Sequence, residues 1–226
     1  MRVAILAVQG AFIEHRKKLE SLGAECIELR KKEDLEQPFD GLILPGGEST
    51  VQGKLLRELE MYDSLKEKIE SGMPVLATCA GLILLAEHLS NDEHVYFGTL
   101  PVTVRRNAYG RQLGSFHTDA EVKGIGEVPM TFIREPYIET ADEQVQVLAH
   151  VDDRIVAVQY GAQIGLSFHP ELDADSRIHE KFLGLIADCI KNNNCKKNGS
   201  IIFFVGLTLP RYRFSKPSAS LDMNLR

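Results

Sequence analysis

Met73-Pro-Val-Leu-Ala-Thr-Cys-Ala-Gly-Leu-Ile-Leu-Leu85 is the stretch that decides the fold of this 226-residue chain. Its apolar start, residues 74–78, predicts a buried strand, and an apolar helix is expected over residues 81–89. The small residues between them predict a sharp turn that carries Cys79. A thiol at such a turn stands clear of the sheet, and the helix N-terminus favours its thiolate form. The stretch therefore predicts a nucleophile at Cys79.

The N-terminal half of the chain alternates between strand and helix patterns. Strands are expected at residues 3–8, 24–29 and 40–44, and helices at residues 12–22, 52–59 and 62–71. This alternation predicts an α/β fold with a parallel sheet that helices cover on both faces.

The middle of the chain changes to short strand patterns separated by Gly and Pro. These patterns predict antiparallel strands added to the sheet, at residues 100–104, 130–133, 145–149, 155–159 and 164–168. A final amphipathic helix is expected over residues 175–191. We see no internal repeat, and we expect one domain over residues 1–191.

Residues 192–226 have a different composition. They hold six Lys or Arg against one acidic residue, whereas the whole chain carries a net charge of −6. We expect this basic C-terminal tail to be a mobile extension, or sequence foreign to the fold such as read-through translation. A docking arm for an acidic partner is the alternative.

The bulk composition is that of a soluble globular protein, with 44% hydrophobic and 26% charged residues. The net charge gives no indication of nucleic acid or of an anionic membrane as a partner. A strand pattern begins directly after Met1, and no apolar run approaches the ~20 residues that span a bilayer. The four cysteines show neither CxxC spacing nor a metal-ligand pattern with the histidines. We therefore expect a cytoplasmic protein without a metal.

A histidine and a carboxylate lie close together in Ser167-Phe-His-Pro-Glu-Leu172. An extended backbone around Pro170 would place His169 and Glu171 on the same side. Glu171 could then orient one ring nitrogen of His169 while the other takes the proton of a thiol. Taken alone, the pair is more often a solvated strand end; together with Cys79 it favours nucleophilic acyl chemistry.

The turn Pro45-Gly-Gly-Glu-Ser49 has three interpretations. Adjacent glycines let backbone N–H groups point at an anion, which suits an oxyanion hole formed by Gly47 and Ala80. A phosphate loop is the second, although the full GxxxxGK[ST] pattern is absent. A plain tight turn is the third.

These segments together resemble one family. Pro-Gly-Gly-Glu-Ser-Thr (45–50), Thr-Cys-Ala-Gly-Leu-Ile (78–83), Arg-Asn-Ala-Tyr-Gly-Arg-Gln (106–112), Phe-Ile-Arg (132–134) and Ser-Phe-His-Pro-Glu-Leu (167–172) occur in order. Together with Val8-Gln9-Gly10, they are similar to the glutaminase subunits of pyridoxal 5′-phosphate synthases, which are class I glutamine amidotransferases. The resemblance covers roughly residues 1–191.

The resemblance implies a three-layer, flavodoxin-like fold and a glutaminase with a Cys-His-Glu triad. It makes Cys79 the nucleophile, His169 the general base and acid, and Glu171 the orienting carboxylate. It also implies ammonia transfer to a synthase subunit within a large hetero-oligomer, low activity of the chain alone, and no cofactor. The glutamine-binding positions that it implies are Gly46, Gly47, Glu48, Arg106, Ile133 and Arg134.

Several positions depart from the family pattern, and other functions stay open. Ala77 replaces the usual Gly, Arg105 stands where an acidic or neutral residue is common, and Glu135-Pro-Tyr137 replaces Ala-Pro-His. The alternatives are a glutaminase that feeds another synthase, a cysteine peptidase or DJ-1-like protein, and a non-catalytic regulatory subunit on the same fold.

Overall fold

A ten-stranded sheet forms the middle of the molecule, and the computed structural model describes the chain over residues 1–106, 115–133 and 136–192. Five strands pair in parallel at one end of the sheet, and β3, β4 and β12 are buried at every residue because helices cover both faces. In spatial order these strands are β2 (Glu25–Leu29), β1 (Arg2–Leu6), β3 (Gly41–Leu44), β4 (Val75–Thr78) and β12 (Gln163–Leu166).

The sheet continues beyond β12 with mainly antiparallel pairs. β11 pairs antiparallel with β12, β10 and β9, and β9 pairs antiparallel with β6, whereas the edge strand β5 runs parallel to β6. A separate two-stranded sheet consists of β7 and β8. The bounds are β5 (Ala86–Leu89), β6 (Leu100–Arg105), β7 (Ser115–Val122), β8 (Gly126–Ile133), β9 (Tyr137–Ala141), β10 (Gln146–Val151) and β11 (Arg154–Tyr160).

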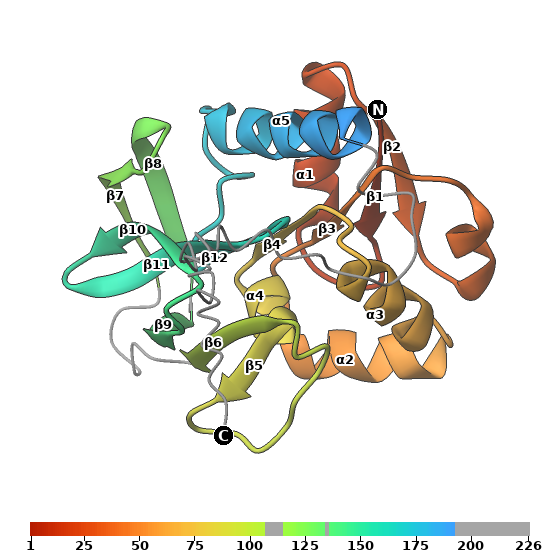
Figure 1. Cartoon of the computed structure of the whole chain (residues 1–226), viewed down its shortest axis with the longest axis horizontal. Coiled ribbons are helices and arrows are strands. Elements are labelled where there is room, and N and C mark those ends of the chain that lie inside the picture. The colour runs from red at the N-terminus through yellow and green to blue at the C-terminus, as the bar shows by residue number, and fades with distance from the viewer. Residues whose placement is uncertain (107–114, 134–135, 193–226) are drawn as a thin grey trace, which may run out of the picture.

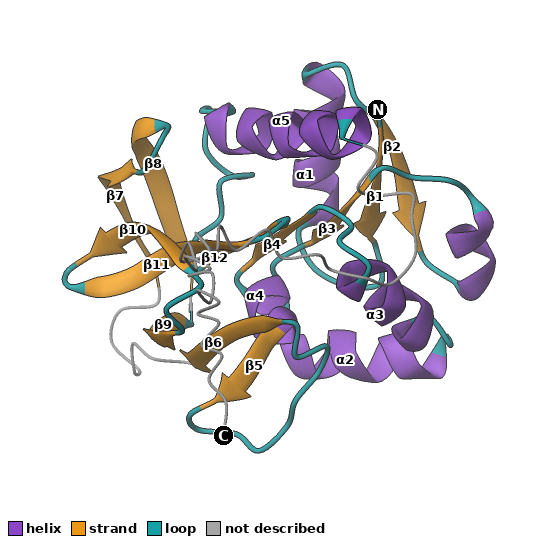
Figure 2. Cartoon of the chain, viewed as in Figure 1, coloured by secondary structure: helices purple, strands orange, loops and turns teal. Residues whose placement is uncertain are grey.

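Helices form a layer on each face of the sheet (Figures 1 and 2). One buried cluster includes Leu56, Leu65 and Leu82 of three helices on one face. A second cluster includes Leu19 and Phe182 of the two helices on the other face. The first layer contains α2 (Ser49–Glu58), α3 (Tyr62–Glu70) and α4 (Ala80–Leu85), the second contains α1 (Phe12–Ser21) and α5 (Arg177–Lys191), and η1 (Lys32–Glu36) is a short 3-10 helix.

The expected fold class is confirmed: three layers, with a mainly parallel sheet and added antiparallel strands. One helix prediction is wrong in its second half. The helix expected over residues 81–89 ends at Leu85, and β5 follows, because Ala86 and Leu89 pair with Leu100 and Val104 of β6. Strands β7 and β9 were not predicted. The basic C-terminal tail from residue 193 onward lies outside the described residues.

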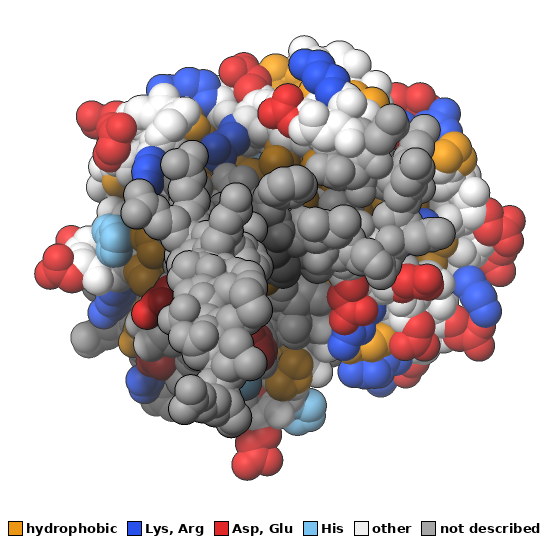
Figure 3. Space-filling view, in the orientation of Figure 1, with side chains coloured by type: hydrophobic (Ala, Val, Ile, Leu, Met, Phe, Trp, Pro, Cys, Tyr) orange, Lys and Arg blue, Asp and Glu red, His pale blue; other side chains and the backbone are white. Residues whose placement is uncertain are grey.

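Charged side chains of both signs are interspersed on the face that Figure 3 shows. Among the helices of the described residues, none is long and apolar enough to cross a bilayer.

Candidate active site

The carboxyl ends of three adjacent strands meet at one edge of the sheet. β4 lies between β3 and β12, with Ala77 in register with Leu44 and Thr78 in register with Leu166. The loops that leave these strands carry the glycine turn, Cys79 and His169, although the residues lie far apart in the sequence. The crevice outside the carboxyl ends of parallel strands is where α/β sheets bind ligands. A pocket of about 530 Å³ opens there, lined in part by Cys79 and His169.

Cys79 occupies the sharp turn between β4 and α4. Its backbone has φ 47° and ψ −101°, a left-handed conformation that costs energy for any residue with a side chain. Its N–H donates to the Leu166 carbonyl at 2.9 Å, which holds the strained residue against β12. Gly81 permits the close start of the helix, since a Cβ there would lie 2.0 Å from the Leu44 carbonyl oxygen. The geometry is that of a nucleophile elbow.

His169 and Glu171 point at one another, as their spacing predicted. The Nδ1 atom of His169 lies 2.7 Å from Oε1 of Glu171, and both side chains are buried. The backbone N–H of His169 donates to the Thr131 carbonyl of β8 at 2.8 Å, so the two-stranded sheet holds the loop that carries His169 in place. The structure thus brings Cys79, His169 and Glu171 together.

The electrostatics of the three groups favour a charged imidazole. Burial alone would lower the pKa of His169, but interactions with the Cys79 thiol and the Glu171 carboxylate raise that pKa to about 10. Burial would raise the pKa of Glu171, yet the adjacent His15 and His169 lower it. An imidazolium beside the Glu171 carboxylate is therefore favoured at neutral pH, and its positive charge adjoins the Cys79 side chain that would act as the nucleophile.

The glycine turn lies directly over the triad. A Cβ on Gly46 would stand 2.3 Å from Cε1 of His169, so only glycine allows this close approach. The Gly46 N–H donates to the Thr78 hydroxyl at 2.9 Å. Gly47 lines the pocket, and within the described residues its N–H has no hydrogen-bond partner. Ala80, the other predicted oxyanion donor, is the first residue of α4, where a helix leaves its N–H groups unpaired.

Charged side chains also line the pocket. Arg106 forms an ion pair with Asp92, and its second terminal nitrogen lies 3.5 Å from Oε1 of Glu48. Hydrogen bonds from His94, with a contribution from Arg106, lower the pKa of Asp92 to about 2, so this partner stays ionised. Glu48, Arg106 and Ile133, which the resemblance implied as glutamine-binding positions, all line the pocket. Arg134 lies outside the described residues.

Several lining residues were not predicted as site residues. Gln9 accepts the Glu48 N–H through Oε1 at 2.8 Å, and its carbonyl accepts from Gln52 at 3.0 Å. Gly10 has φ 102° and lies against the Gly46 carbonyl, where a Cβ would not fit. The Val8-Gln9-Gly10 segment was the sequence signal that could have identified Gln9 and Gly10 as site residues. The unpredicted lining residues are Gln9, Gly10, Ala11, Ser49, Ile83 and Pro136.

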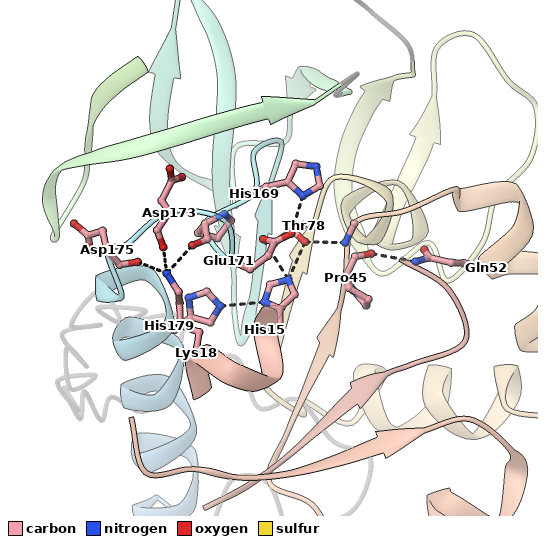
Figure 4. A network of polar contacts seen from close by, with 12 residues as sticks. His15, Lys18, Pro45, Gln52, Thr78, His169, Glu171, Asp173, Asp175 and His179 are labelled. Carbon is pink, nitrogen blue, oxygen red and sulfur yellow. Dashed lines mark hydrogen bonds and ion pairs between the residues drawn. The ribbon is translucent and has the colours of Figure 1, made fainter. Parts of the chain in front are cut away.

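Figure 4 shows a network of polar contacts that includes His169 and Glu171. His15 of α1 contacts Thr78, Glu171 and His179 of α5. One turn along α1, the Lys18 ammonium donates to three backbone carbonyls of the segment that follows His169, those of Pro170, Asp173 and Asp175. In the part of the chain that the structure describes, no group of three or more His, Cys, Asp or Glu side chains is placed to hold a metal ion.

The chain matches the model of the SNO glutamine amidotransferase family over residues 5–188. It is 64% identical over 197 residues to pyridoxal 5′-phosphate synthase subunit PdxT of Desulfitobacterium hafniense, covering 87% of this chain and 98% of that protein. It is 53% identical to the PdxT subunit of Streptococcus pneumoniae, covering 81% and 96% of the two chains. A crystal structure of a glutamine amidotransferase superposes with a TM-score of 0.78 at 45% identity, covering 82% and 98%.

Proposed function

The chain belongs to the SNO glutamine amidotransferase family, and from that premise we propose that it hydrolyses L-glutamine as the glutaminase subunit of a pyridoxal 5′-phosphate synthase. The observation that supports the chemistry best is the buried arrangement of Cys79, His169 and Glu171 at the pocket. The ammonia released would pass to the synthase subunit, as the resemblance implied.

Cys79 acts as the nucleophile. Its thiolate attacks the side-chain amide carbon of glutamine, and the developing oxyanion accepts hydrogen bonds from the N–H groups of Gly47 and Ala80. His169, charged beside the thiolate, gives its proton to the departing ammonia. His169 then removes a proton from water, and the water oxygen attacks the γ-glutamyl thioester. Cleavage of the thioester bond releases glutamate and frees the Cys79 sulfur, and His169 is again protonated. Glu171 holds the imidazole in the orientation that both steps need.

Glutamine is bound through charges of both signs. The Arg106 guanidinium suits the α-carboxylate, and the Glu48 carboxylate suits the α-ammonium. Gly46, Gly47 and Ile133 line the pocket and give it its shape, and Gly47 would supply the backbone N–H. Arg134, the remaining position from the resemblance, is part of this proposal on sequence alone.

The catalytic domain that we propose spans residues 1–191. The family model ends at residue 188, and α5 ends at Lys191. Residues 192–226 would then be dispensable for hydrolysis, which a chain cut after Lys191 tests directly. We also propose a cytoplasmic location, which the need for a reduced Cys79 thiol supports and which cell fractionation tests.

The decisive experiment measures glutamate release from L-glutamine with and without the pyridoxal 5′-phosphate synthase subunit, with Cys79→Ala as the control. We expect turnover that rises when the synthase is added and disappears in the variant. Turnover that rises only with a different synthase would identify another amidotransferase. A folded chain that releases no glutamate with any synthase would favour a regulatory subunit.

A further inference from the structure

Two histidines outside the triad are fully buried in direct contact. Nδ1 of His15 lies 3.0 Å from Nε2 of His179, across the interface between α1 and α5. Neither residue lines the pocket, and the mechanism above uses neither. On its other side, the Nε2 atom of His15 lies 3.2 Å from Thr78 Oγ1 and 3.4 Å from Glu171 Oε2. His15 thus stands between the second histidine and the catalytic carboxylate (Figure 4).

The contacts select one order of protons along this chain. Nδ1 of His179 is buried and has no hydrogen-bond partner within the described residues, so a proton there would be left unpaired. With its proton on Nε2, His179 donates to Nδ1 of His15, and His15 then carries its own proton on Nε2. That N–H faces Thr78 and Glu171. The reverse order would place a nitrogen lone pair against the Glu171 carboxylate.

The His15 N–H reaches both parts of the site. Oε1 of Glu171 is paired with His169, whereas Oε2 has no hydrogen-bond partner within the described residues. Nε2 of His15 lies 3.4 Å from Oε2, so the His15 N–H faces the free side of the carboxylate. The His15 Nε2 atom also contacts Thr78 Oγ1, which accepts the backbone N–H of Gly46. The contact between His15 and Thr78 therefore also supports the glycine turn.

We propose that His15 is a positioning residue for glutamine hydrolysis, whose Nε2–H orients Glu171 and Thr78 while His179 fixes its tautomer. This inference rests on the function proposed above. Both histidines stay neutral, because burial lowers the pKa of each, with Glu171 opposing the shift at His15. The other charged or titratable groups that act on His15 are His169 from the triad, and Glu14 and Lys18 from α1.

Two variants separate the contacts of His15. In His15→Asn the side-chain amide takes the place of Nδ1, which keeps a partner for His179 and removes the contact with Glu171 and Thr78. In His15→Gln the amide nitrogen takes the place of Nε2, which keeps the contact with Glu171 and Thr78 and removes the partner of His179. Misplacing a catalytic group by about 1 Å can cost ~100-fold in rate, so we expect kcat to fall about 100-fold in His15→Asn and no more than about 10-fold in His15→Gln. KM for glutamine should change much less than kcat in both, because His15 does not itself line the pocket.

The assay uses the full chain with the synthase subunit, with thermal unfolding of each variant measured alongside. A merely structural role would make the two variants lose activity together, in proportion to folded protein, and that result overturns the inference. A second readout is independent of turnover: the pH dependence of Cys79 alkylation by iodoacetamide. We expect the profile to shift in His15→Asn and to match wild type in His15→Gln.

The two readouts keep the inference and the proposed function apart. If wild-type protein releases no glutamate with the synthase, the proposed function fails, and the alkylation profiles still test whether His15 positions the triad. Identical profiles in wild type and both variants would overturn the role of His15, whatever reaction the site performs.

Discussion

The hydroxyl oxygen of Thr78 lies 2.9 Å from the backbone nitrogen of Gly46 and accepts its N–H inside the core. Thr78 is the last residue of β4, directly before Cys79, whereas Gly46 belongs to the turn that follows β3. This one hydrogen bond therefore ties the strand that carries the nucleophile to the turn that covers it. A contact between two parts of an active site should affect both stability and rate when it is removed.

Thr78→Val keeps the shape of the side chain and removes this acceptor. It leaves the buried Gly46 N–H unpaired, so we expect the free energy of unfolding to fall by about 1–3 kcal/mol and kcat to fall at least ~10-fold. Urea denaturation and glutamate release measure the two effects. Thr78→Ser keeps the oxygen and should retain most of the activity. Equal kcat values in the two variants would contradict the role given to the hydroxyl.

Gly46→Ala tests the close approach of the turn to the triad. The new methyl group would lie 2.3 Å from Cε1 of His169 and 3.4 Å from Cβ of Cys79, so the imidazole must move. We expect kcat to fall by about 100-fold or more, with a stability loss of about 1–3 kcal/mol from overpacking.

Gly184→Ala is the matched control for that substitution. Gly184 is exposed within α5, and a Cβ there meets no atom within 4 Å. Alanine in a helix interior is better than glycine by roughly 0.5–1 kcal/mol, so stability should rise by about that amount while activity is unchanged. Glutamate release equal to wild type in Gly46→Ala would refute the steric argument.

Local sequence patterns predicted the parallel half of the sheet well, because its strands are continuous apolar runs and its helices have one apolar face. They failed where pairing between distant residues decides the structure. Residues 86–89 continue a helical pattern, yet they form a strand since β6 supplies the partner. β7 does alternate in burial along most of its length, but its polar composition hid the pattern.

The candidate site also has one part that the sequence predicts and one part that only the packing reveals. Cys79, His169 and Glu171 lie in short motifs that the sequence shows and that point to catalysis when taken together, and the fold brings the three residues together. His15 and His179 are separated by 164 positions, and each occurs in an ordinary helical pattern. Nothing local distinguishes a histidine that supports a triad from one exposed on a helix, so only the packing of α1 and α5 reveals the pair.

Lys18→Met tests the anchor of the loop that carries His169 and Glu171. The Lys18 ammonium donates to the carbonyls of Pro170, Asp173 and Asp175, so its loss removes three hydrogen bonds between that segment and α1. We expect a stability loss of about 1–3 kcal/mol and a kcat loss of about 10-fold or more. Lys17→Met, exposed on the same helix, is the matched control and should resemble wild type. Full activity in Lys18→Met would show that the loop holds its geometry without the lysine.

Stability should pass through a maximum near neutral pH. Burial lowers the pKa values of His15 and His179, so below about pH 6.5 the unfolded chain binds protons that the folded chain does not. Stability therefore decreases as the pH is lowered below about 6.5. The pKa of His169 is raised to about 10, so its contribution is fully present below about pH 6.5 and is lost as pH rises through about 10.

Each histidine contributes a slope of up to about 1.4 kcal/mol per pH unit to this profile. Urea denaturation at a series of pH values measures it. His179→Phe removes one of the two buried histidines that act between about pH 6.5 and 5, so its stability should fall less steeply as the pH is lowered over that range. An acid slope equal to that of wild type would mean that His179 is protonated in the folded protein.

Arg106→Gln tests recognition of the substrate α-carboxylate. Arg106 is held by Asp92 and lies at the pocket beside Glu48, so its guanidinium is positioned before glutamine binds. A charge-assisted hydrogen bond contributes about 1.5–3 kcal/mol, so we expect KM for glutamine to rise about 10- to 100-fold, with a smaller change in kcat. Arg105→Gln is the matched control, because the neighbouring side chain is half exposed, pairs with Glu139 and does not line the pocket. If the two variants changed KM equally, general loss of positive charge, rather than a contact made by Arg106, would explain the effect.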